Sequence, residues 1–151
     1  MPQFIGTSMT RGFAGMLTRG FFDNTTEVKA NDNTSPVNAF GIPVKINSAG
    51  TGVTPVTAAA DSVYGFAVRI YGQTNYSPKG EYVQNQQPVT VMRRGYMAVS
   101  VSGGTAALGG TVYLSATGKI TADSSGSTAI PNCTFMGTAD ADGLVEIAFN
   151  I

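Results

Sequence analysis

The sequence has no histidine and a single cysteine, Cys133. Histidine is the side chain that proteins use most often as a general base and as a metal ligand, so its absence removes the commonest form of both sites. One cysteine also excludes a disulfide within the chain and a cysteine-based zinc site. We interpret Cys133 as a small apolar residue in a strand rather than as a reactive thiol.

Charged side chains are scarce as well, at 12% of the 151 residues, about half of the usual share of roughly 25%. Nine basic and nine acidic residues cancel and form no basic block, which argues against nucleic-acid binding as the main task. The surface must then consist largely of uncharged polar residues and glycine. Such a neutral, hydrogen-bonding surface suits contact with other proteins.

Long hydrophobic runs are missing too. No window approaches the roughly 18 apolar residues that a membrane span needs. Residues 1–10 show neither the charged leader nor the apolar run of a signal peptide. We therefore expect a protein that folds in a cytoplasm and has no contact with a membrane.

The short motifs that resemble phosphate-binding, calcium-binding or catalytic sites are all incomplete. Gly118-Lys119 lacks the first glycine of a phosphate-binding loop, and Ile120 stands where a magnesium-binding Ser or Thr is required. Asp140 and Asp142 are explained better by a turn than by calcium, because the other ligands are missing. No Gly-x-Ser-x-Gly motif surrounds any serine. We predict no enzymatic activity, no cofactor and no metal.

The stretch 89–114 shows the clearest strand pattern. Val89 and Val91 alternate with polar or flexible neighbours, and Arg93-Arg94-Gly95 then interrupts the alternation. The pattern resumes at Met97, with every second residue apolar. A period of two marks a strand with one buried face, and an internal glycine marks a bulge or bend where the strand turns a corner.

Similar patterns recur along the chain. The expected strands are residues 39–46, 62–71, 111–114, 118–121, 132–139 and 144–151, with a weak one at 53–60. The turn at 140–143 is a good hairpin signal. Eight to ten strands without a convincing helix predict one all-β domain, a β-sandwich or jelly-roll-like fold or a small barrel, over residues 35–151.

Residues 1–34 differ from the rest of the chain in composition and pattern. They contain four of the eight phenylalanines and frequent glycines, and apolar and polar residues show no sustained alternation. We interpret them as an extended N-terminal arm carrying apolar anchors. These anchors are Phe4, Ile5, Phe13, Met16, Leu17, Phe21 and Phe22. Two interpretations are open: the anchors cover the domain's own core, or some dock on a neighbouring subunit.

Two further features are candidates for protein contact. The polar loop at 72–87 is long and, together with the residue before it, presents Tyr71, Tyr76 and Tyr82. Tyrosine buries a large area at low entropic cost, so an interface and a solvated loop are both open interpretations. Arg93 and Arg94 form the one adjacent basic pair, which either meets acidic groups on a partner or lies at a polar bulge on the sheet rim.

The order of these segments carries a family resemblance. GFAGMLTRGFFDN (12–24) is followed by AFGIPV (39–44), then by YGFAVRIY (64–71) and the tyrosine-bearing loop. VTVMRRGYMAVSV (89–101), GGTVYLSATGKIT (109–121) and DADGLVEIAFN (140–150) complete the series. This order resembles the structural cement, or decoration, proteins of tailed-bacteriophage capsids over nearly the whole chain. The cysteine and asparagine of IPNCTF (130–135) depart from the pattern, where glycine and more charge are expected.

The resemblance implies an all-β protein that binds the outer surface of a capsid and clamps adjacent major capsid protein subunits against internal DNA pressure. The implied partners are the major capsid protein and neighbouring copies of itself, as a dimer or trimer at capsid symmetry axes. The implied location is the virion, after synthesis in the host cytoplasm. The family has no catalytic residues to carry over.

The alternative is a receptor-binding or carbohydrate-binding β-sandwich of a phage tail fibre. Such a module would present a clustered aromatic platform, and this chain has no tryptophan.

Overall fold

The computed structural model describes residues 12–69 and 88–151, and the predicted contact residues Phe4, Tyr71, Tyr76 and Tyr82 lie outside these ranges. The described part contains nine strands, one 3-10 turn and no α-helix, which confirms the all-β prediction. The elements in chain order are η1 (Phe21–Asp23), β1 (Thr25–Lys29), β2 (Pro43–Ile46), β3 (Val53–Pro55), β4 (Gly65–Ala67), β5 (Val89–Ser100), β6 (Thr111–Leu114), β7 (Ile120–Thr121), β8 (Thr128–Phe135) and β9 (Leu144–Phe149).

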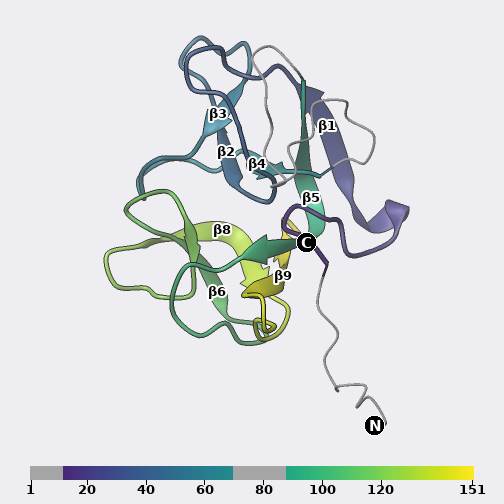
Figure 1. The fold of residues 1–151 in the computed structure, drawn as a ribbon, viewed down its shortest axis with the longest axis vertical. Helices are drawn as coiled ribbons and strands as arrows, with labels where there is room; N and C mark the ends of the chain where they lie inside the picture. Colours follow the sequence, from purple (N-terminus) through teal and green to yellow (C-terminus); the bar gives the residue numbers. More distant parts are fainter. Residues whose placement is uncertain (1–11, 70–87) are drawn as a thin grey trace, which may run out of the picture.

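The long strand β5 links two groups of strands (Figure 1). The strand order is β3-β2-β4-β5-β9-β8-β6-β7, and β1 pairs with β5 off this path. All pairs between these named strands are antiparallel. The first half of β5 lies between β1 and β4, since Met92 faces both Thr26 and Phe66. The second half pairs with β9, where Met97 faces Ile147.

Gly95 is the point where β5 changes partners. Its φ of +138° is a conformation that L side chains rarely adopt. Met92 and Met97 both enter the main core although one number is even and the other odd. The two-residue period of the strand therefore shifts by one residue between Met92 and Met97, and the pairing with β1 is irregular just before Gly95, where the neighbouring residues Thr25 and Thr26 face Arg94 and Met92. The bend predicted from the glycine break is confirmed.

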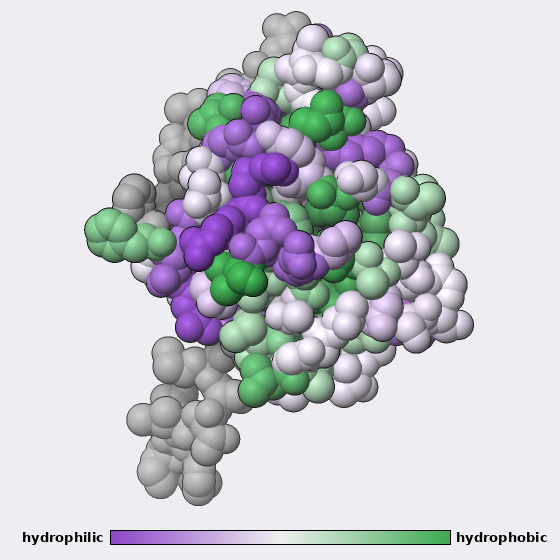
Figure 2. Space-filling model, turned by 180° about the vertical axis from the view of Figure 1, so that it is seen from behind, coloured by the Kyte–Doolittle hydropathy of each residue, from purple (hydrophilic) through white to green (hydrophobic). Residues whose placement is uncertain are grey.

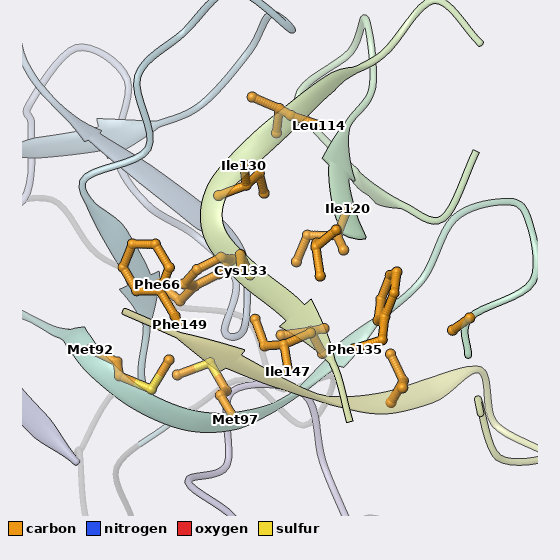
Figure 3. Packing of buried hydrophobic residues seen from close by; sticks show 14 of the residues in the cluster. Phe66, Met92, Met97, Leu114, Ile120, Ile130, Cys133, Phe135, Ile147 and Phe149 are labelled. Carbon is orange, nitrogen blue, oxygen red and sulfur yellow. The ribbon is translucent and has the colours of Figure 1, made fainter. Parts of the chain in front are cut away.

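The described residues form two hydrophobic cores. The main core receives side chains from each of the strands β4 to β9, and Figure 3 labels ten of its residues. Within it the rings of Phe66 and Phe149 meet edge to face, with centroids 5.1 Å apart. The smaller core consists of Val37, Val44, Val53, Ala67, Val89 and Val91.

The smaller core is enclosed because the strands around it close on themselves. After β1 the chain reaches β3, where Val53 N–H donates to Ala30 O at 2.9 Å and Asp32 N–H donates to Val53 O at 3.0 Å. Asn31, which is buried, holds Val37 through its side chain at 2.7 and 3.2 Å. The strands β1, β5, β4, β2 and β3 thus form a small barrel-like ring.

Some strand limits differ from the sequence-based expectation. The strand expected at 132–139 runs from Thr128 to Phe135, because pairing with β6 through Leu114↔Thr128 extends it toward its N-terminus. The strand expected at 62–71 is assigned only to Gly65–Ala67 in β4. The last strand ends at Phe149, and Ile151 is exposed.

Candidate functional site

The described residues were compared first with the requirements of a metal site and of a membrane span. They contain no group of three or more acidic, histidine or cysteine side chains that could hold a metal ion. None of the helical segments in these ranges has the length and hydrophobicity needed to cross a lipid bilayer. Asp140 acts as predicted in a turn, where its Oδ1 accepts hydrogen bonds from the N–H groups of Asp142 and Leu144, both at 2.9 Å.

A surface hollow of about 290 Å³ lies between residues 59–64 and β8, with Asp61, Ser62 and Arg93 in its lining. Both charges are already engaged. Asp61 pairs with Lys45 at 2.8 Å, and Arg93 pairs with Glu27 at 3.2 Å. The chain has no histidine that could activate Ser62 as a nucleophile.

Part of the predicted N-terminal arm follows β5. Gly15 N–H donates to Ala98 O at 2.8 Å, and Ala98 N–H donates to Met16 O at 3.0 Å. Leu17 forms a bridge with Met97 and packs against the main core. β1 then pairs with the first half of β5. Leu17 therefore serves the domain's own core, whereas the division of the chain at residue 34 stays a prediction.

A buried carboxylate fixes the arm where it leaves β5. Glu146, on β9, accepts a hydrogen bond from Thr18 Oγ1 at 2.6 Å. Arg19 donates to both oxygens of the same carboxylate, Nε at 2.7 Å and an Nη at 3.0 Å. The Arg19 guanidinium also lies over the Tyr96 ring, 4.4 Å from its centroid. The hydrogen bond and charge of Glu146 raise the pKa of Arg19. We call Thr18, Arg19 and Glu146 the Glu146 clasp.

A second set of contacts holds the chain a few residues further on. The side-chain N–H₂ of Asn24 donates to Arg19 O at 3.1 Å and to Gly20 O at 3.0 Å. Its Oδ1 accepts the Tyr96 N–H at 2.8 Å. We call these contacts the Asn24 clasp. It fills the space beside Gly95, where a Cβ would lie 2.8 Å from Asn24 Cγ.

Between the two clasps the chain forms the η1 corner, residues 19–24. Phe22, at its centre, is 94% exposed. The side chain of Phe21 lies outside the described part. Phe13 is 52% exposed, with the Arg69 guanidinium over its ring at 4.3 Å. The structure thus places two of the predicted anchors, Phe13 and Phe22, at the surface.

The predicted arginine pair divides into two environments. Arg93 lies over the Tyr64 ring, 3.6 Å from its centroid, and donates to Tyr64 O. Tyr64 Oη donates to Glu27, and this hydrogen bond is the main cause that lowers the pKa of Glu27. Arg94 is exposed and faces Thr25 of β1. Arg93 therefore ties β1 to the domain, and Arg94 is the member of the pair that is open to solvent.

The surface around these elements is mixed in character. Figure 2 shows a band of hydrophilic residues on one face, with hydrophobic groups at its margins. Exposed large apolar residues in the described part include Phe22 at the η1 corner, Val28 on β1 and Leu108 in the loop after β5. Among the described residues, these exposed apolar side chains come from separate segments of the chain.

Sequence reasoning missed the Glu146 clasp. Alternation places Glu146 on the outer face of the last strand, but all six residues of β9 are buried. The available signal is a single acidic residue within LVEIAF, since a charge inside an apolar strand needs a partner. Nothing in the spacing identifies Arg19, which lies 127 residues away.

Comparison with known proteins gives two findings. A family model described as structural cement protein (E217 gp24/Pam3 gp6) matches residues 1–150. A chain from the solved structure entitled "The capsid of Myoviridae Phage XM1" matches with a TM-score of 0.64 and 18% identity, over 99% of this chain and 97% of that chain. A search of curated proteins finds no match. At this identity the structural likeness establishes a shared fold.

Proposed function

The chain belongs to the phage structural cement protein family, and from this premise we propose that it binds the outer surface of a capsid shell and stabilises contacts between adjacent major capsid protein subunits. Its role in the virion is structural. The proposed partners are the major capsid protein and neighbouring copies of this chain, as a dimer or trimer at symmetry axes. No step of this function requires catalysis, a cofactor or a metal.

The observation that carries the proposal is the η1 corner. A phenylalanine that is 94% exposed stands on a segment hydrogen-bonded at both ends to the β-domain. Exposed aromatic groups are a liability in a free protein, but they are typical anchors of interfaces. We propose that Phe22 is the principal anchor on the shell, with Arg94 and Phe13 as flanking contacts.

The energetics favour an anchor that is already in place. Fixing one backbone residue costs about 1–2 kcal/mol, so an arm that orders only on binding would offset much of the gain from its anchors. Residues 15–18 and β1 are already paired with β5. Burying Phe22 then contributes about 1.5–3 kcal/mol without that ordering cost. Repetition over a closed lattice multiplies this modest contact.

We propose that the other predicted contact residues belong to the same interface, without assigning a specific contact to any of them. Phe4, Phe21, Tyr71, Tyr76 and Tyr82 would extend the same interface, and their side chains lie outside the described part of the chain. Arg93 is proposed to act indirectly, because it is engaged with Tyr64 and Glu27.

The test uses undecorated capsid shells mixed with purified protein, with bound protein measured after sedimentation. We expect wild-type protein to co-sediment and Phe22→Ala to bind about 10- to 150-fold more weakly, as the loss of one buried aromatic implies. Leu108→Ala is the matched control, because Leu108 is 73% exposed and lies outside the η1 corner.

The outcomes separate two levels of the proposal. If wild-type protein fails to bind shells, the capsid-binding function is wrong. If wild type binds and Phe22→Ala binds equally well, capsid binding stands and the assignment of Phe22 is wrong. Shells carrying the wild-type protein should also release DNA at a higher temperature than undecorated ones.

A further inference from the structure

The carboxylate of Glu146 is buried beneath the N-terminal arm. Its side chain is 9% exposed, and that of Arg19 is 43% exposed. Burying a carboxylate is costly unless it is paired and hydrogen-bonded. An apolar residue or glutamine would satisfy the packing of β9 at this position without that cost. The packing of the core therefore does not explain why residue 146 carries a negative charge.

We propose that Glu146 is a positioning residue for capsid attachment: the Glu146 clasp holds the η1 corner in the place from which Phe22 engages the shell. The inference rests on the proposed function, since it assigns a role to Glu146 within that binding event. Glu146 acts through Thr18 and Arg19 and does not itself touch the partner.

The contacts fix the corner at both ends. Thr18 and Arg19 are held by Glu146 at 2.6, 2.7 and 3.0 Å. At the other end, Asn24 Oδ1 accepts a hydrogen bond from Tyr96 N–H at 2.8 Å. The side-chain N–H₂ of Asn24 donates to Arg19 O and Gly20 O. Only residues 20–23 lie between these points, and Asp23 N–H closes a turn onto Gly20 O at 3.0 Å.

The geometry of the Glu146 clasp also sets a register. A bidentate pair between guanidinium and carboxylate is directional, so it accepts Arg19 at one position along the strand. A shift of the arm by one residue would turn Leu17 away from Met97 and the core and would bring Arg19 off the carboxylate. The clasp thus couples the packing of Leu17 to the placement of Phe22.

Loss of the clasp would reduce the fraction of molecules with a correctly placed corner. The apparent affinity falls in proportion to that fraction, because binding must first select the competent conformation. If the corner is correctly placed about one-tenth of the time, attachment weakens about tenfold although every contact residue is still present.

The test compares Glu146→Gln with Asp61→Asn, which removes another ion-paired carboxylate. The described partners of Asp61 are Lys45, Thr57 and Ala58, all outside residues 15–24. Amide hydrogen exchange on the free protein should rise in residues 15–24 of Glu146→Gln, with the exchange of β8 and β9 unchanged. Shell binding should weaken about tenfold for Glu146→Gln and stay at the wild-type level for Asp61→Asn.

A double-mutant cycle tests whether Glu146 acts only by placing the corner. If Glu146→Gln lowers only the fraction of competent molecules and Phe22→Ala lowers only their intrinsic affinity, the two free-energy effects should add, so Phe22→Ala should weaken binding by the same factor in both backgrounds. Strong coupling between the two substitutions would overturn the proposal, because Glu146→Gln would then change the Phe22 contact itself. Asn24→Ala is a second, independent variant for the case that Glu146→Gln fails to fold, because it loosens the same corner from its exposed end.

The two failures are distinguishable. If Phe22→Ala has no effect on binding in the wild-type background, the proposed anchor is wrong. If Phe22→Ala weakens binding but Glu146→Gln and Asn24→Ala leave both local exchange and binding unchanged, the anchor stands and the positioning role of Glu146 is refuted.

Discussion

Replacing Gly95 with alanine is expected to destabilise the protein more than replacing a glycine that has open space around it. Gly95 has a φ of +138°, and a Cβ there would lie 2.8 Å from Asn24 Cγ and 2.9 Å from Asn24 Cα. Real Cβ contacts essentially never fall below 3.0 Å, so Asn24 must move. Its movement would break the hydrogen bonds to Tyr96 N–H, Arg19 O and Gly20 O.

The magnitude follows from these two effects. A residue held in a sparsely populated backbone region costs about 1–3 kcal/mol. Each lost hydrogen bond costs about 0.5–1.5 kcal/mol, toward the lower end at an exposed site. We therefore expect Gly95→Ala to lower the free energy of unfolding by about 3 kcal/mol or more. With a urea m-value of about 1–3 kcal/mol/M, the midpoint should fall by about 1–3 M.

The control is Gly50→Ala. Gly50 also has a positive φ, +70°, but nothing lies within 4 Å of the position that a Cβ would take there. It should lose only the conformational part, about 1–2 kcal/mol. Urea unfolding followed by circular dichroism gives both midpoints. Equal losses for the two variants would refute the argument that Asn24 and Gly95 are packed as a unit at the corner of β5.

Two further predictions concern titratable groups. Burial raises the pKa of the Cys133 thiol to about 12. An Ellman assay at about pH 8, below the ordinary thiol pKa, should therefore detect no reactive thiol in the native protein and one per chain in denaturant. Rapid reaction of the native protein would contradict the place of Cys133 in the core. Hydrogen bonds, first from Lys45 and then from Thr57 N–H, lower the pKa of Asp61 from its ordinary value of 3.8. The stabilisation from Asp61 is therefore present above about pH 4 and is lost as the pH falls through the lower folded pKa. Acid unfolding of Asp61→Asn should depend less steeply on pH than that of the wild type, and identical slopes would show that the Lys45 pair contributes nothing.

The alternation of apolar residues predicts the strands well where one strand faces one core. It places the corner at Gly95, because a glycine after two arginines breaks the period of two. It gives the wrong outer face for Glu146, because period alone does not reveal that a further segment covers that face. Both sides of β9 are buried, one by the core and the other partly by Thr18 and Arg19.

The candidate site is predictable only in part. The excess of phenylalanine in residues 1–34 indicates anchors, and Phe13 and Phe22 are exposed. The same composition cannot separate these from Leu17, which packs against the core. That distinction depends on pairing between segments far apart in sequence, as at Leu17 and Met97, and such pairings are not encoded in local pattern. The arginine pair likewise looks uniform in sequence, although Arg93 is the one that lies over the Tyr64 ring.

The most direct test of the central claim is a cryo-EM reconstruction of shells decorated with the purified protein, at a resolution that shows side chains. The account predicts density for the β-domain on the outer surface, with the η1 corner against the major capsid protein and the Phe22 ring buried in that contact. Density inside the shell or on the tail, or an η1 corner that faces solvent in the decorated particle, would contradict it.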